Sequence, residues 1–140
     1  MSTVVSILNK VQRADIAKVS IDAMRLTQDD LANTNRDRMN DGFRADGTEM
    51  PIYSYISQTV YGYPNTRIKL RDTGSFQDSI IVSVDASSKR VKQTSTDNKT
   101  TMLVERYGDI FGTFGVYKNS YINEFLKPAF IKLMRNSIGL

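Results

Sequence analysis

The first part of the chain contains the feature that most restricts the fold. Between Thr3 and Asp41 there is neither proline nor glycine. Apolar residues recur there at intervals of three and four, the pattern of one face of a helix. They are Val4, Ile7, Leu8 and Val11 and, after a change of phase, Ile16, Val19, Ala23, Met24, Leu26 and Leu31. Residues 3–41 are therefore predicted to be helical.

The change of phase indicates two helices within this region. Asp15 stands where the second pattern begins, and aspartate is a favourable N-cap residue. We predict a short first helix, a break near residues 14–15 and a longer second helix that ends near Gly42. The last part of the second helix, NTNRDRMND, is polar all round, so we expect it to project into solvent or to touch a partner.

The middle of the chain predicts a long loop followed by a small sheet. The loop covers residues 42–66, where an Asp-Gly pair favours a turn and a proline interrupts regular helix. The sheet and its turn cover residues 67–96. Residues 80–85 and 90–96 are expected to form a hairpin, with residues 67–70 as its partner strand.

The C-terminal part, residues 98–137, is predicted to be helical again, with a glycine- and aromatic-rich loop inside it. Pro128 lies within an apolar helical stripe and predicts a kink, because proline lacks the N–H that a helix requires. The expected fold is a single α+β domain of residues 1–140. It consists of N-terminal helices, a small antiparallel sheet with a hairpin, and a C-terminal helix packed on the sheet.

Two missing residue types narrow the possible functions. The 140 residues include no cysteine and no histidine. Disulfides and thiolate nucleophiles are therefore excluded, together with the commonest general base near neutral pH. We expect a protein that is not an enzyme and that has no cofactor, metal site or catalytic residue. The triplet Asp72-Thr73-Gly74 is also found in aspartic proteases, but a catalytic pair would then require a symmetric dimer and a largely β chain.

The net charge of +4 is concentrated in the middle of the chain. Residues 61–100 carry seven basic and four acidic side chains, which gives +3. This segment favours contact with an acidic protein surface, and as an alternative it fits a nucleic-acid-binding module. Within it, Arg67, Lys69 and Arg71 alternate with apolar residues and are candidate partner contacts.

Four tyrosines mark the loop before the basic segment: Tyr53, Tyr55, Tyr61 and Tyr63. Tyrosine buries a large ring and keeps its hydroxyl in water, so it suits half-buried loops and subunit interfaces. One interpretation is a loop held on the core by its aromatic rings, and another is an inter-subunit contact. A base-stacking platform has less support, because no RNA-binding strand pattern surrounds these rings.

The sequence RDTGSFQDSI has a structural interpretation. Asp72 and Thr73 are good cap residues, and Gly74 permits a left-handed backbone conformation. Ser75 and Asp78 fit a capping box, which would start one helical turn. We expect that turn to direct Phe76 into the core and to lead into the strand that begins at Ile80.

The same segment, LRDTGSFQDSI, resembles the L-x-D-T-G-x-L/F-x-x-S-I signature of the tailed-phage virion morphogenesis and tail-completion proteins. The matching positions are Asp72, Thr73, Gly74, Phe76, Ser79 and Ile80. The segments MNDGFRADGTEMPIYS and LVERYGDIFG are similar to parts of small proteins from phages and prophages of Bacteroides-like hosts. The resemblance spans residues 37–112. It departs from the family at Phe76, where leucine is usual, and at ERYGDIFG.

This resemblance implies a structural virion protein at the neck, between the capsid vertex and the tail. Such proteins form homo-oligomeric rings around the DNA channel and contact portal or adaptor proteins and tail proteins, with a passing contact to genomic DNA. The implied location is the virion, after assembly in the host cytoplasm. No membrane contact is expected, because the chain has no stretch of about 18 apolar residues.

Overall fold

The computed structural model describes residues 3–13, 15–63, 66–70, 74–88 and 90–139. Within them the helices are α1 (Val4–Arg13), α2 (Ile16–Leu26), α3 (Gln28–Asn40), α4 (Tyr55–Val60), α5 (Ser75–Asp78), α6 (Thr100–Tyr107), α7 (Gly115–Tyr121) and α8 (Lys127–Ser137). A π-helical turn, Ile122–Leu126, joins α7 to α8. The strands are β1 (Ile80–Asp85) and β2 (Arg90–Ser95).

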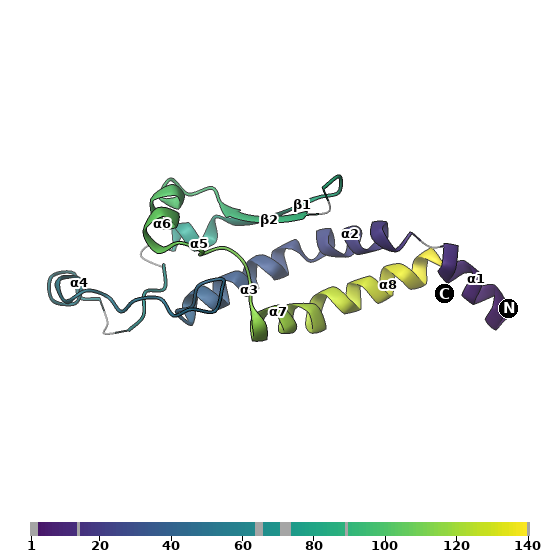
Figure 1. Cartoon of the computed structure of the whole chain (residues 1–140), viewed down its shortest axis with the longest axis horizontal. Helices are drawn as coiled ribbons and strands as arrows, with labels where there is room; N and C mark the ends of the chain where they lie inside the picture. The colour runs from purple at the N-terminus through teal and green to yellow at the C-terminus, as the bar shows by residue number, and fades with distance from the viewer. Residues whose placement is uncertain (1–2, 14, 64–65, 71–73, 89, 140) are drawn as a thin grey trace.

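Helices α2 and α3 form the central layer (Figure 1). The hairpin lies along one side of this layer and contacts α3 and α2 through β1. On the other side α8 packs along α2, and α7 packs along α3. The α+β class with N-terminal helices, an antiparallel hairpin and a C-terminal helix is confirmed. The C-terminal helix α8, however, packs extensively on α2, which lies between it and the hairpin, and not on the sheet as predicted.

The predicted start of the second helix is confirmed. The Asp15 carboxylate accepts a hydrogen bond from the backbone N–H of Lys18, with N and O 3.0 Å apart. The helix is not continuous, however, because α2 ends at Leu26 and α3 begins at Gln28. Between them the buried Thr27 hydroxyl donates to a backbone carbonyl of α2 and lies 2.7 Å from the Tyr121 hydroxyl. This contact anchors the helix junction to α7.

The hairpin confirms the two predicted strands. The pairing runs from Ile80 opposite Ser95 to Asp85 opposite Arg90. The prediction of residues 67–70 as a third strand is wrong, because the sheet of the described residues has two strands. Arg67 instead forms an isolated bridge with Ile52. Leu70 has φ of 56°, a left-handed conformation that ends an extended segment.

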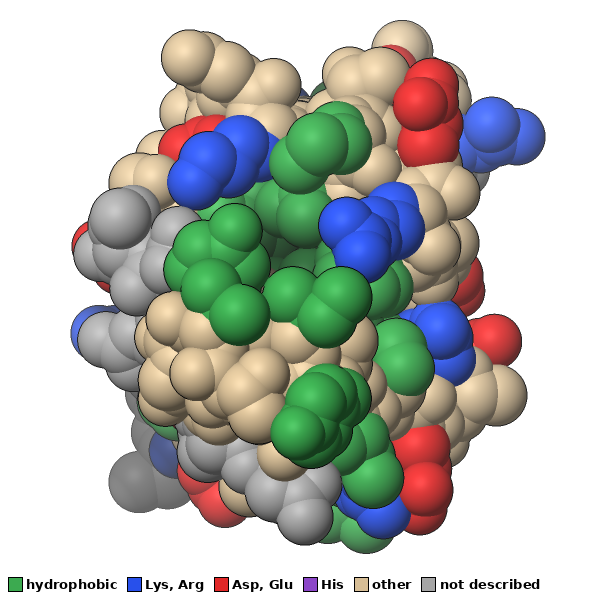
Figure 2. All heavy atoms as spheres, turned by 90° about the vertical axis from the view of Figure 1, so that its left-hand side faces the viewer, with side chains coloured by type: hydrophobic (Ala, Val, Ile, Leu, Met, Phe, Trp, Pro, Cys, Tyr) green, Lys and Arg blue, Asp and Glu red, His purple; other side chains and the backbone are tan. Residues whose placement is uncertain are grey.

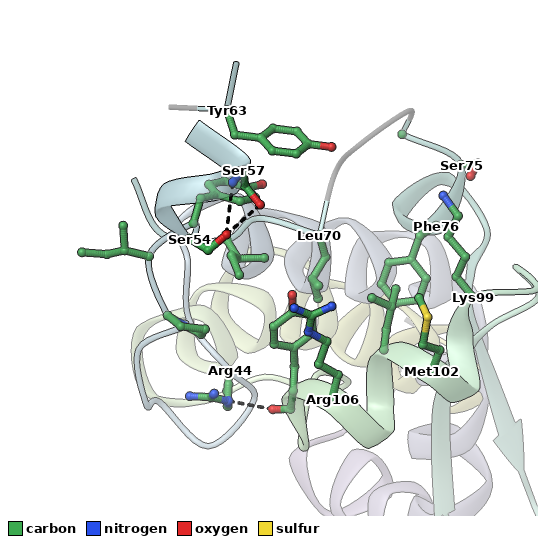
Figure 3. A pocket seen from close by; sticks show the side chains of 17 residues that line it. Arg44, Ser54, Ser57, Tyr63, Leu70, Ser75, Phe76, Lys99, Met102 and Arg106 are labelled. Carbon is green, nitrogen blue, oxygen red and sulfur yellow. Dashed lines mark hydrogen bonds between the residues drawn. The ribbon is translucent and has the colours of Figure 1, made fainter. Parts of the chain in front are cut away.

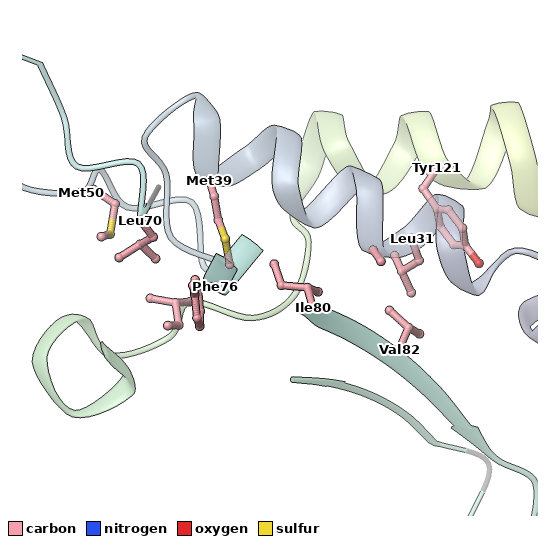
Figure 4. Close-up of a cluster of buried hydrophobic side chains, with 10 residues drawn as sticks. Leu31, Met39, Met50, Leu70, Phe76, Ile80, Val82 and Tyr121 are labelled. Carbon is pink, nitrogen blue, oxygen red and sulfur yellow. The ribbon is translucent and has the colours of Figure 1, made fainter. Parts of the chain in front are cut away.

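The buried apolar core lies between α3, the start of β1 and α7 (Figure 4). Phe76 is 4% exposed within it, which confirms its predicted burial. Ile80 and Val82 extend the core along the strand, since alternate residues of β1 face the helices. The buried members of the core are Leu31, Ala32, Met39, Met50, Leu70, Phe76, Ile80, Val82, Ile110 and Tyr121.

The polar end of α3 is exposed on one face only: Asn33, Asp37 and Asp41 are exposed, as predicted for a helix end in solvent, but the opposite face is buried. Asn35 and Arg38 are both 0% exposed. The Arg38 guanidinium donates to the carbonyls of Gly112, Ile110 and Phe43 and to the side chain of Asn35. Burial lowers the pKa of Arg38 to about 10. One side chain thus fixes two loops that have no regular structure of their own.

The π-helical turn Ile122–Leu126 immediately precedes the helix that contains Pro128. The backbone N–H of Lys127 donates to the carbonyl of Ile122, five residues earlier. Pro128 stands in the first turn of α8, where a missing N–H costs least. The π-helical turn therefore accommodates the proline inside the apolar stripe.

Candidate functional site

A groove with a cavity volume of about 550 Å³ opens at the end of the molecule that carries α4 and α6 (Figure 2). Its walls come from the loop before and after α4, from the segment around α5 and from α6. The lining residues are Arg44, Pro51, Ile52, Tyr53, Ser54, Ser57, Tyr63, Ile68, Leu70, Gly74, Ser75, Phe76, Lys99, Met102, Leu103, Arg106 and Tyr107. We call it the α6 groove.

The floor of the α6 groove is apolar and belongs to the core. Leu70 and Phe76 lie beneath it, and Met102 projects from α6 at its side (Figure 3). Leu70 and Phe76 are nearly fully buried, whereas Met102 is 54% exposed. The groove therefore combines a rigid apolar floor with an accessible apolar wall.

The rim of the α6 groove is cationic. Arg44, Lys99 and Arg106 line it, and none of its described lining residues is acidic. Arg44 is fixed in place, because its guanidinium donates to the carbonyl of Tyr107 at 2.7 Å and to that of Glu49 at 2.7 Å. The Arg106 guanidinium lies 5.5 Å from the ring centre of Tyr107. The groove is suited to an apolar segment that carries acidic groups.

The four predicted tyrosines divide into two pairs. Tyr53 and Tyr63 line the α6 groove, and their rings stack with centres 4.8 Å apart and an interplanar angle of 12°. Tyr55 and Tyr61, at the two ends of α4, lie outside the groove and are 79% and 71% exposed. The first pair thus matches the interpretation of rings held on the body, and the second pair has the exposure that an interface requires.

The segment of residues 42–66, predicted to be a loop, contains the short helix α4. Ser54 caps it, accepting from the backbone N–H of Ser57 at 3.1 Å. Ile52, Ile56 and Val60 are between 59% and 68% exposed. Together with Tyr55 and Tyr61 they form what we call the α4 patch. Exposed apolar side chains concentrated in this way indicate a contact surface.

The predicted basic edge is only partly available to a partner. The Arg67 guanidinium forms an ion pair with Glu49, with N and O 2.6 Å apart, and lies 5.1 Å from the centre of the Phe43 ring. Lys69 is exposed, and its carbonyl accepts a hydrogen bond from the Gln77 side chain. Arg71 lies outside the described residues. Sequence reasoning missed Arg44 and Arg106, whose role depends on a groove formed by distant segments.

The signature turn has the predicted architecture at Gly74 but not at Ser75. Gly74 has φ of 89°, the left-handed conformation that favours glycine, and it precedes α5 as the N-cap residue. Ser75 is therefore inside α5, and its hydroxyl bonds to Asp97 at 2.9 Å, so the predicted capping box with Asp78 is wrong. Asp72 and Thr73 lie outside the described residues.

Helix α3 holds the end of this turn. The Arg36 guanidinium donates to the carbonyl of Gln77 at 2.6 Å and to that of Ile80 at 3.1 Å. Ser79 is the C-cap of α5, and Ile80 begins β1. Residues 74–80 therefore connect the groove floor to the hairpin, and hydrogen bonds from Arg36 of α3 fix this connection.

A second groove, with a cavity volume of about 480 Å³, lies between α3 and α7. We call it the acidic groove, because Asp30, Asp37, Asp41 and Glu124 are among its lining residues. The others are Asn33, Thr34, Asn40, Val116, Tyr117, Ser120 and Phe125. Sequence reasoning missed this groove, although three of its aspartates are seven and four residues apart and so share one helical face.

Tyr117 occupies part of the acidic groove. Its hydroxyl donates to the Asp41 carboxylate. Burial, and then this hydrogen bond, raise the pKa of Tyr117 to about 12, so the phenol stays protonated at neutral pH. The described residues contain no group of three or more acidic side chains that could hold a metal ion. The groove is thus a surface that presents negative charge beside apolar side chains.

Comparisons of the chain with protein-family models, curated proteins and solved structures found no match. Among the helices that the structure describes, none is both long and apolar enough to cross a lipid bilayer.

Proposed function

We propose that the chain is a structural virion protein of a tailed phage. In this role it forms a ring at the head–tail interface, as a neck connector or tail-completion protein, and joins the capsid vertex to the tail around the DNA channel. The signature resemblance suggests the family. The observation that carries an assembly role is the α6 groove, whose apolar floor, cationic rim and neighbouring α4 patch form one end of the molecule.

Apolar surface that the single chain leaves in contact with water favours association with a partner. Burial of a side chain the size of leucine or methionine favours association by about 1.5–3 kcal/mol. Met102, Ile56 and Val60 are each more than half exposed in the single chain. A docked partner segment would cover them, and the cations at the rim would favour acidic residues in that segment. The proposed partners are the portal or adaptor protein and tail proteins of the virion.

The alternative function is a nucleic-acid-binding module. It rests on the basic central segment, but Arg67 is already paired with Glu49. A titration with duplex DNA at two salt concentrations separates the two functions. Affinity that falls steeply with salt would favour the nucleic-acid module, because phosphate contacts release counterions. The structural role predicts weak binding at most, which corresponds to a passing contact with the genome.

The test of the structural role uses phage particles produced without this protein. We expect DNA-filled heads and tails that remain separate in electron micrographs. Normal, infectious particles would overturn the proposal.

Complementation then tests the α6 groove. Met102→Asp places a charge on the exposed wall of the groove, and we expect it to leave heads and tails unjoined. Val104→Asp is the matched control, since Val104 lies on the same helix, is 39% exposed and does not line the groove. Particles joined equally well by both variants would show that the groove has no part in assembly.

A further inference from the structure

Helix α6 presents one row of side chains to the α6 groove. Lys99, Met102, Leu103, Arg106 and Tyr107 all line the groove, and their intervals of three and four positions place them on one helical face. Lys99 is the N-cap residue and has α-helical backbone angles, so it continues the row. Leu103 and Tyr107 are half-buried and pack against the core, whereas the other three residues are exposed. The accessible part of the row is therefore a cation, an apolar side chain and a second cation (Figure 3).

The two cations of this row are available to a partner. Among the described residues, neither Lys99 nor Arg106 belongs to an ion pair. Arg106 contacts the face of the Tyr107 ring, and a contact of this kind does not use its N–H donors. Asp97 interacts with the charge of Lys99, but its carboxylate already accepts hydrogen bonds from the Ser75 hydroxyl and the backbone N–H of Lys99. Both cations can therefore pair with acidic groups that enter the groove.

The row is held in place at both ends of α6. At the start, the Thr100 hydroxyl donates to the carbonyl of Ser95 at the end of β2, with the two oxygens 3.2 Å apart. At the other end, the Arg44 guanidinium donates to the carbonyl of Tyr107 at 2.7 Å. A surface that is ordered before binding loses less conformational entropy when a partner docks. The row is therefore organised for recognition in the free chain.

The groove is open to solvent along its apolar walls. Tyr63 lies across the groove from α6, with Leu70 between them (Figure 3). Ile52, which also lines the groove, is 59% exposed, and Met102 on α6 is 54% exposed. Sites for small molecules enclose most of the surface of their ligand. The α6 groove leaves both of these side chains accessible, so it is better suited to a segment of a macromolecule.

We propose that the α6 groove binds an amphipathic α-helix of a neighbouring virion protein. This helix carries two acidic residues seven positions apart, with apolar residues between them. Its apolar residues cover Met102, and its acidic residues pair with Lys99 and Arg106. The inference rests on the proposed virion function, and it specifies the secondary structure and the charge pattern of the partner segment.

The spacing of the two cations favours a helix over an extended segment. Lys99 and Arg106 are seven positions apart, which corresponds to about 10 Å along α6 at a rise of about 1.5 Å per residue. Acidic residues seven positions apart on a partner helix have the same separation and share one face. In an extended strand, residues about 10 Å apart are three positions apart and point to opposite faces. A helix that runs along α6 therefore matches both cations at once.

Peptide binding to the full-length chain tests the inference. The probe is a synthetic peptide of about 18 residues, since shorter isolated helices are marginal in water. This matched peptide has two glutamates seven positions apart and two leucines between them. A shifted peptide of the same composition has its glutamates nine positions apart, which places them on opposite helical faces. In fluorescence anisotropy we expect the matched peptide to bind about tenfold more tightly. Equal affinities, or no binding of the matched peptide, would overturn the inference.

Charge reversal on the protein locates the contact. Arg106→Glu and Lys99→Glu are each expected to weaken binding of the matched peptide about tenfold. Lys92→Glu is the matched control, because Lys92 is exposed on β2, does not line the groove and gives the same change in net charge. It should change the affinity about twofold at most, since salt screens distant charges. Circular dichroism checks that the variants remain folded. Equal losses for all three would show that net charge alone attracts the peptide, and the proposed site would then be wrong.

Two measurements test other occupants of the groove. Sedimentation compares self-association of the wild-type chain and of Arg106→Glu, and we expect no difference between them. Loss of self-association in this variant would show that a second copy occupies the groove. Competition with duplex DNA tests phosphate as the ligand, and we expect the matched peptide to stay bound. Displacement by DNA would assign the cations to nucleic acid, and either of these contrary results would refute binding of a partner helix.

These outcomes are separate from those of the proposed function. Selective binding of the matched peptide that Arg106→Glu removes, combined with normal particles in the absence of the protein, would preserve the helix site and remove the virion role. Unjoined particles in the absence of the protein, combined with equal binding of the matched and shifted peptides, would preserve the role and remove the helix site.

Discussion

Helices α3 and α1 distribute their side chains in opposite ways. The end of α3 is rich in polar residues, yet Asn35 and Arg38 are completely buried. α1 has a continuous apolar face, yet Val4 and Leu8 are more than half exposed. Polarity alone therefore does not separate inside from outside in this molecule. What separates them is whether a side chain has a partner within the same chain.

The buried polar residues of α3 have such partners. The loops around Phe43 and around Ile110–Gly112 turn backbone carbonyls toward the interior, and buried carbonyls require donors. Arginine supplies five N–H donors in a fixed geometry, so one residue satisfies several carbonyls. Val4 and Leu8 of α1, by contrast, remain more than half exposed on their own chain.

Replacement of Arg38 should have the largest effect. Arg38→Ala leaves the buried carbonyls of Phe43, Ile110 and Gly112 without this donor, so we expect a loss of about 3–5 kcal/mol in the free energy of unfolding. Chemical denaturation measures it. Arg25→Ala is the control, because the contact described for Arg25 is a long surface ion pair with Asp22 at 4.0 Å, and its loss should cost at most about 0.5 kcal/mol. Similar losses for both variants would contradict the role of Arg38.

Gly74 should show the next largest effect. Gly74→Val forces a β-branched residue to φ near 89°, which should cost about 1–2 kcal/mol or more. Gly74→Asn is the matched variant, since asparagine tolerates the left-handed region better and should lose less. Thermal melting compares the two proteins. An unchanged melting temperature for Gly74→Val would show that the turn does not depend on this backbone conformation.

Tyr121→Phe should have a smaller effect, of about 1 kcal/mol, because it removes one buried hydrogen bond to Thr27. Tyr117→Phe removes a hydrogen bond to Asp41 at the surface of the acidic groove and should cost less. Denaturation curves of the two variants test whether the junction between α2 and α3 is held through α7. A larger loss for Tyr117→Phe would reverse this interpretation.

The smallest effect is expected on α1. Leu8→Ser should change the stability of the single chain by at most about 0.5 kcal/mol, because the side chain is already exposed. The measurement is made at a concentration low enough to keep the chain monomeric. A loss of several kcal/mol would show that the α1 face is covered within the same chain, and the contrast with α3 would then fail.

Features that depend on neighbouring residues could be predicted from the sequence. The Asp15 cap, the hairpin of β1 and β2 and the inward Phe76 all follow from patterns a few residues long. The third strand at residues 67–70 was predicted from alternation alone. The structure instead has an isolated bridge between Arg67 and Ile52 and a left-handed backbone at Leu70. Neither feature can be inferred from alternating polar and apolar residues.

The candidate site was predictable only in part. Tyr53, Tyr63, Gly74 and Phe76 had been selected from the sequence, and the structure places them around the α6 groove. The sequence could not predict that Arg44 and Arg106 line the same groove, because these residues come from segments distant in the chain. The acidic groove was likewise missed, since α3 and α7 are brought together by the fold.

The sequence by itself determined where α2 begins at its Asp15 cap, where the two hairpin strands lie, where the backbone turns at Gly74, and which chemistry the absence of cysteine and histidine excludes. These features depend on residue type and on interactions within a few positions of the chain. Only the tertiary structure decided that Arg38 lies inside and Leu8 outside. The physical reason is that burial depends on partners distant in sequence: Arg38 bonds to Gly112, 74 positions away, whereas Leu8 remains 55% exposed.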